Sequence, residues 1–107
     1  MEEETSGEMR CTQCRRPFAT EDRIASMSGS IMGDEHTDSY LLCPVCAVYT
    51  VVSWRDDFTG VETVECSGPI DKQQGDVQVG IIRQCSRPWD KKCRCDAHVR
   101  YFRGTLD

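Results

Sequence analysis

The sequence predicts a small fold that is mixed but mainly β, with antiparallel hairpins and a short C-terminal helix. Apolar and β-branched residues flank the segment CPVC on both sides, and two strand-like segments, YTVVSW and VETVEC, are joined by the turn sequence RDDFTG. Glycines interrupt the other apolar stretches, so the 107-residue chain can bury only a limited core. Its 8 cysteines exceed what packing requires. Together these features predict a fold that is stabilised by bound metal.

The N-terminal segment MEEETSGEMR is acidic and lacks the basic and apolar regions of a signal peptide. No apolar run approaches the roughly 18 residues that cross a bilayer. We therefore expect a cytoplasmic protein that does not associate with membranes. In a reducing compartment, thiols at C-x-x-C spacing are metal ligands or redox groups rather than disulfides.

The chain is long enough for one domain. We expect a disordered acidic tail over residues 1–9 and a single metal-stabilised domain over residues 10–107. This domain could consist of two lobes, with residues 10–65 around the first cysteines and residues 66–107 around a second cluster of cysteine and histidine.

Further elements follow from local patterns. The small, apolar segment RIASMSGSIMG is expected to form a strand or a hairpin arm, and DEHTDS has the composition of a turn. The segment YTVVSW-RDDFTG-VETVEC predicts a β-hairpin with one solvated face. DVQVGIIRQC fits a strand or a helix, and Gly80 favours the strand. DAHVRYF predicts a short terminal helix that begins near Asp96.

The strongest functional signal is a pair of C-x-x-C motifs, formed by Cys11 and Cys14 and by Cys43 and Cys46. Two thiolates three positions apart on a tight turn can reach one metal ion at about 2.3 Å, and two such turns complete a tetrahedron. The 28 residues between the motifs suffice for a hairpin that returns the second motif to the first. We therefore expect these four cysteines to bind one Zn²⁺.

These motifs resemble the zinc-ribbon group, in which two cysteine knuckles, here CTQC and CPVC, meet at the end of a small antiparallel sheet. The proline of CPVC and the flanking segments YLL and AVYTVV are typical of that group. The resemblance covers residues 10–66 and implies zinc on the four cysteines of the two knuckles. A treble-clef arrangement, with a helix at the second knuckle, is disfavoured because AVYTVV is β-prone.

The remaining cysteines predict a second zinc site. Its expected ligands are Cys66, Cys85, Cys93 and Cys95. His98 is an alternative ligand, because Cys95-Asp-Ala-His98 repeats the two-residue gap. The competing interpretations are buried free cysteines beside a surface histidine, and a crossed arrangement in which the first knuckle shares its metal with Cys66 and Cys85. His36 is expected to be a solvated turn residue.

The closed ligand sets favour structural metals, and neither a small-molecule substrate nor a catalytic group is evident, so we expect no enzyme activity. The first hypothesis is a protein-interaction adaptor. The formal net charge is −5, but residues 83–103 hold seven basic and two acidic residues, so a nucleic-acid-binding accessory is the alternative. Its candidate contacts are Arg83, Arg87, Trp89, Lys91, Lys92, Arg94 and Arg100. A thiol redox or metal sensor is the second alternative.

Overall fold

Four antiparallel strands form one sheet in the order β1-β2-β3-β4. The computed structural model describes residues 9–57 and 59–107, so the expected tail at residues 1–9 lies outside the described part except for Met9. The strands are β1 (Arg23–Ile31), β2 (Asp34–Leu42), β3 (Val48–Asp56) and β4 (Glu62–Asp71), and a 3₁₀ turn, η2 (Thr20–Asp22), precedes β1.

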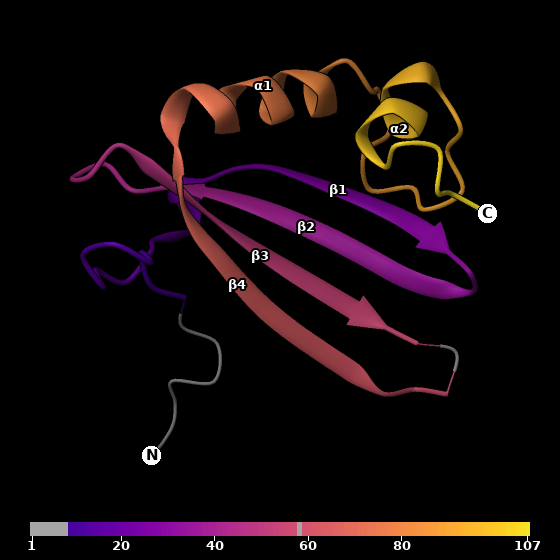
Figure 1. Cartoon of the computed structure of the whole chain (residues 1–107), viewed down its shortest axis with the longest axis horizontal. Coiled ribbons are helices and arrows are strands. Elements are labelled where there is room, and N and C mark those ends of the chain that lie inside the picture. The colour runs from indigo at the N-terminus through magenta and orange to yellow at the C-terminus, as the bar shows by residue number, and fades with distance from the viewer. Residues whose placement is uncertain (1–8, 58) are drawn as a thin grey trace.

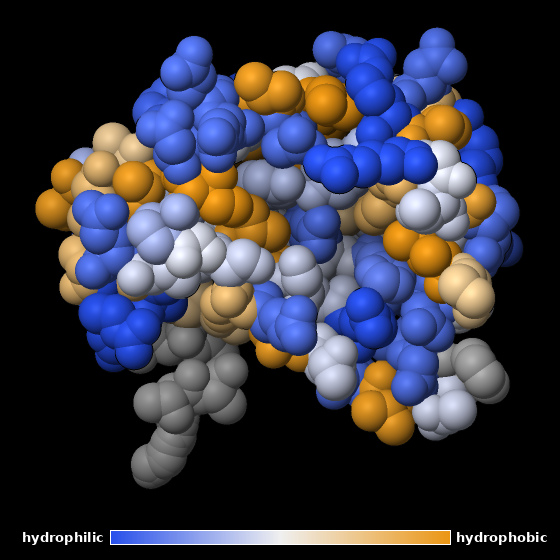
Figure 2. Space-filling model, in the orientation of Figure 1, coloured by the Kyte–Doolittle hydropathy of each residue, from blue (hydrophilic) through white to orange (hydrophobic). Residues whose placement is uncertain are grey.

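Two helices, α1 (Lys72–Arg83) and α2 (Asp96–Tyr101), lie on the same face of this sheet (Figure 1). The structure thus confirms a mainly β fold with a short C-terminal helix. In the same view, Figure 2 shows hydrophobic side chains below α1 and at the end of the sheet where β2 ends. None of the helices within the described residues has the length and apolar character needed to cross a membrane.

The predicted hairpin over YTVVSW-RDDFTG-VETVEC is present as β3 and β4, with Val52 opposite Cys66. Asp57 closes its turn, because its side chain accepts hydrogen bonds from the backbone N–H groups of Thr59 and Val61 at 2.9 and 3.0 Å. A bulge and the Gly68–Pro69 bond interrupt the regular pairing near the end of β4.

The prediction of a turn at DEHTDS was wrong, because these residues begin β2. The turn lies two residues earlier, at Met32 and Gly33, whose φ angles are 51° and 87°. Two-residue hairpin loops favour such positive φ values because their twist matches that of the strands. The carboxylate of Asp107 accepts hydrogen bonds from the backbone N–H groups of both turn residues.

The preference for a strand over DVQVGIIRQC was also wrong, because α1 covers most of this segment. Asp71 caps the helix by accepting a hydrogen bond from the backbone N–H of Gln73 at 3.1 Å. The buried positions are Gly75, Val79 and Ile82, which recur at helical spacing. Gly80, which favours a strand in the sequence, lies on the exposed side of α1, where packing of the buried face outweighs its weak helix propensity.

The core lies between the helices and the sheet, and it joins the two halves of the chain. Its buried members are Met27, Tyr40, Tyr49, Val51, Val79, Ile82, Cys85, Ala97 and Phe102. Tyr40 makes edge-to-face contacts with Tyr49 and Tyr101, at ring-centroid distances of 6.1 and 6.3 Å. Aromatic pairs of this kind add to the free energy gained by burial. Residues 10–65 and 66–107 therefore share one core.

Two glycines of α1 should respond in opposite ways to alanine. A Cβ at Gly75 would lie 2.0 Å from Tyr49 Cδ2, whereas nothing lies within 4 Å of a Cβ at Gly80. Gly75→Ala should lower the free energy of unfolding by about 1–3 kcal/mol through overpacking. Gly80→Ala should raise it by about 0.5–1 kcal/mol through helix propensity. Thermal unfolding of the metal-loaded variants measures both, and equal shifts would contradict the packing of α1.

Candidate metal centres

The two knuckles meet at one end of the sheet. The second, residues 43–46, connects β2 to β3, and the first, residues 11–14, lies beside it. The Sγ atoms of Cys11, Cys14, Cys43 and Cys46 all lie within 4.8 Å of one another. Two sulfurs bound to a tetrahedral zinc ion at about 2.3 Å are about 3.8 Å apart, and the Cys14–Cys43 distance is 3.8 Å. This group of thiols could hold a metal ion.

Each knuckle has the same backbone geometry. The N–H of Arg15 donates to Cys11 O, and the N–H of Ala47 donates to Cys43 O, both at 2.9 Å. Arg15 and Ala47 follow the second cysteine of each motif and have positive φ angles of 69° and 57°. The repeated turn directs both cysteines of each motif toward one point. β3 begins directly after the second knuckle, where a treble clef would have a helix.

Hydrogen bonds link the first knuckle to the sheet. The backbone N–H of Thr12 donates to Thr50 Oγ1 at 3.0 Å, and the two threonine hydroxyls are also hydrogen-bonded. Thr50 is completely buried, as are Cys11 and Cys43. The first knuckle therefore covers one end of the sheet, on the face away from the helices.

The second cluster consists of Cys85, Cys93, Cys95 and His98, whose ligand atoms also lie within 4.8 Å of one another. Cys85 follows α1 directly, and Cys95 is the N-cap of α2, where its sulfur accepts a hydrogen bond from the His98 N–H at 3.4 Å. Cys85 Sγ lies 3.8 Å from Cys93 Sγ and 3.1 Å from His98 Nδ1. Three sulfurs and one imidazole nitrogen form a donor set that suits zinc.

The imidazole of His98 is completely buried, and its two nitrogens have different partners. Nδ1 faces the cysteines, whereas Nε2 lies 2.8 Å from the backbone carbonyl oxygen of Ser28. A carbonyl accepts only, so Nε2 carries the proton and Nδ1 presents its lone pair to the cluster. This arrangement is typical of metal-binding histidines, in which a second contact fixes the ring and its tautomer.

Local hydrogen bonds and burial change the acidity of the thiols. The backbone N–H of His98 lowers the pKa of Cys95 to about 6. Burial raises the pKa of Cys85 to about 11. In the first cluster, burial opposes ionisation of Cys11, but hydrogen bonds from the backbone of Cys14 and Gln13 lower its pKa to about 7. Neighbouring thiolates repel one another, and a dication among them would favour ionisation of all four.

One expected ligand, Cys66, lies outside the clusters. Cys66 is exposed on β4. Its predicted approach to Cys85 depended on a strand over residues 77–85, but α1 occupies most of these residues. The structure therefore does not support Cys66 as a ligand, because His98 completes the second cluster. Among the described residues, the first knuckle groups with Cys43 and Cys46 and not with Cys66 and Cys85. His36 belongs to β2, opposite Gly29 and Arg55, and not to a turn.

A partly buried polar network holds α2 on the sheet, and the sequence did not reveal it. Tyr101 donates a hydrogen bond to Asp38 Oδ2 at 2.6 Å, and Ser53 donates to Asp38 Oδ1 at 2.8 Å. Tyr40 and Tyr101 share a hydrogen bond of 2.8 Å. Burial and the charge of Asp38 raise the pKa of Tyr101 well above its usual range. No local pattern connects these residues, since β2, β3 and α2 each contribute to the network.

The fold and the two clusters define a class: a small, mainly β protein with two cysteine-rich groups that could each hold a metal ion. No protein-family model, curated protein or solved structure matches this chain.

The metal content of two cysteine variants tests the assignment of ligands. Cys93→Ser should lower the content from two metal ions per chain to one, because Cys93 belongs to the second cluster. Cys66→Ser, the matched control, should retain two ions, because Cys66 is exposed on β4. Elemental analysis measures the ratio. Loss of an ion in the Cys66 variant, or two ions in the Cys93 variant, would contradict the ligand set.

Proposed function

We propose that this chain is a cytoplasmic zinc-binding protein whose two metal ions are structural, and that it acts as a protein-interaction adaptor without catalytic activity. Four side chains converge in each cluster, whereas a catalytic zinc ion keeps three protein ligands and one open position. The eight cysteines are free thiols, as expected for metal ligands in a reducing compartment. These features support structural metal sites.

The observation that carries the adaptor role is the exposure of Trp89. Its side chain is 69% exposed, although it lies in a loop that is held on both sides. Cys85 and Cys93 flank this loop in the second cluster, and Pro88 O accepts a hydrogen bond from the Ser28 N–H at 2.8 Å. Exposed tryptophan is costly in water and is enriched at protein interfaces. A rigid loop that presents tryptophan suits recognition of another protein.

Three basic residues of the alternative hypothesis, Arg87, Lys91 and Arg94, have structural contacts. Arg87 forms an ion pair with Asp90, and Lys91 forms one with Glu35. Arg94 donates hydrogen bonds to the backbone carbonyls of Lys91, Cys93 and Asp107. Arg83 and Arg100 occupy the last turns of α1 and α2, where positive charge is favourable. These contacts favour a structural role for the positive charges over binding of nucleic acid.

Removal of the metal should unfold the protein. Structural zinc contributes on the order of 10 kcal/mol to the folding of small zinc peptides. After a chelator has removed all metal, we expect the amide proton spectrum to collapse into the range of an unfolded chain, and we expect added Zn²⁺ to restore it. A dispersed spectrum in the metal-free protein would contradict the structural role of the metals.

Photo-crosslinking tests the adaptor role. A photoreactive amino acid at position 87, beside Trp89, should give one discrete protein adduct in cells, and excess unlabelled protein should suppress it. The control carries the same group at position 45, where Val45 is 73% exposed on the second knuckle. Equal adducts at both positions, or no adduct, would contradict the adaptor role. An adduct that nuclease removes would instead support the nucleic-acid hypothesis.

A further inference from the structure

We propose that the uncovered part of the β1 edge, residues 23–26, binds an extended, acidic peptide segment of another protein as an additional strand. The inference rests on the proposed adaptor function, and it names the surface and the chemistry of the partner. Strand addition to an exposed sheet edge is a common mode of peptide recognition.

The second half of the β1 edge is already covered. Ser28 donates its backbone N–H to Pro88 O and accepts a hydrogen bond from His98, and Ser30 O accepts one from the Asp107 N–H at 2.9 Å. Alternate residues of an edge strand direct their backbone groups outward, so the N–H and C=O of Ser26 point the same way as those of Ser28. Among the described residues, Ser26 has no backbone partner on this outer side.

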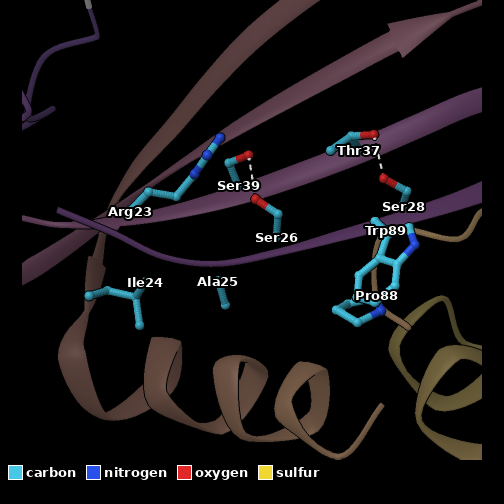
Figure 3. Close-up of a pocket in the computed structure, with 9 residues that line it drawn as sticks. All are labelled: Arg23, Ile24, Ala25, Ser26, Ser28, Thr37, Ser39, Pro88 and Trp89. Atoms are coloured by element: carbon cyan, nitrogen blue, oxygen red, sulfur yellow. Dashed lines mark hydrogen bonds between the residues drawn. The ribbon is translucent and has the colours of Figure 1, made fainter. Parts of the chain in front are cut away.

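A groove of about 450 Å³ lies along this uncovered part. Figure 3 shows Ile24 and Ala25 on the side of β1 that faces α1, and Pro88 and Trp89 beside the strand. On the other side of β1, Ser26 pairs with Ser39 and Ser28 pairs with Thr37 through side-chain hydrogen bonds. Those hydroxyls have partners across the strands. The backbone of β1, rather than these hydroxyls, is therefore what the strand offers to a ligand in the groove.

Pro88 shows how an added strand would pair. Its carbonyl accepts the outward N–H of Ser28, which is the contact that a neighbouring strand would make. At about 3.3 Å per residue, the distance from Arg23 to Ser28 spans about 16 Å. Four or five extended residues would therefore continue the pairing that Pro88 begins.

The charges and apolar groups around the groove define the partner. Arg23 is exposed at one end, and the described residues provide no carboxylate partner for it. At the other end, the Arg87 side chain is 66% exposed beside Trp89. A peptide with an acidic side chain near Arg23 and an apolar side chain on Trp89 would complement the side chains at both ends of the groove.

The opposite edge of the sheet is less suited to strand addition. β4 carries Glu62, Glu65 and Pro69, and a bulge interrupts its pairing with β3. Charges, proline and bulges on an edge strand discourage pairing with other chains. The pairing of β1 with β2 also shifts register between Arg23 and Ala25, but the uncovered residues of β1 contain neither proline nor an acidic residue. The two edges therefore differ, and β1 is the edge that can accept a partner.

The test uses a display library of random heptapeptides selected on the metal-loaded full chain. We expect the recovered peptides to be rich in β-branched residues and to contain aspartate or glutamate. Ser26→Pro removes the outward N–H, which no described group uses, and should weaken binding about tenfold. Ser26→Ala, the matched control, removes the hydroxyl but keeps the N–H and should bind as the wild type does. Arg23→Glu should also weaken binding about tenfold.

Hydrogen exchange provides a direct signature. The amide of Ser26 should exchange slowly only when the peptide is bound. Failure to recover any binder, equal affinity for Ser26→Pro and wild type, or unchanged exchange at Ser26 would overturn the proposal. If Ser26→Pro does not bind two metal ions, the wild-type chain is tested instead with peptides that are N-methylated at alternate amides. Undiminished binding by every methylated peptide would overturn the proposal.

The two proposals fail in different ways. If the crosslink from position 87 persists in the Ser26→Pro variant, the adaptor function stands and the β1 edge is not its binding site. If position 87 gives no adduct in the wild type, the adaptor function itself fails.

Discussion

The contact on which much of this structure depends is made by the buried imidazole of His98. One nitrogen faces Cys85, and the other donates a hydrogen bond to the backbone of Ser28, which is 70 residues away in sequence. A single ring therefore joins the second cysteine cluster to the edge of the sheet. It also positions α2 and, through the cluster, the loop that carries Trp89. Its burial is tolerable because both nitrogens have partners.

The two clusters complement a core of modest size. The first joins the knuckles where β2 ends, and the second joins the end of α1 to α2. Between them, Tyr49 packs so closely on α1 that only glycine fits at position 75. Small domains commonly need metal or disulfides because their surface is large relative to their interior. In this protein, the clustered ligands and the packed aromatic rings connect the same few strands and helices.

The sheet is asymmetric in its faces and in its edges. Both helices cover one face, and the first knuckle covers only the end of the other (Figure 1). β1 is covered by Pro88, His98 and Asp107 over its second half. β4 instead carries acidic residues and proline. Natural sheets protect their edges by covering them and by placing charges or proline on them. The cover on β1 is incomplete, so residues 23–26 differ from the rest of that edge.

The sequence alone determined the features that depend on local spacing. The C-x-x-C motifs identified the four thiols of the first cluster, and β-branched segments identified the hairpin of β3 and β4, because two-residue gaps and alternation are local properties. The tertiary structure decided the rest. It replaced Cys66 by His98, since the segment after β4 is a helix whose buried face includes Gly75. Contacts such as that of His98 with Ser28 arise only when distant segments pack, and no local pattern records them.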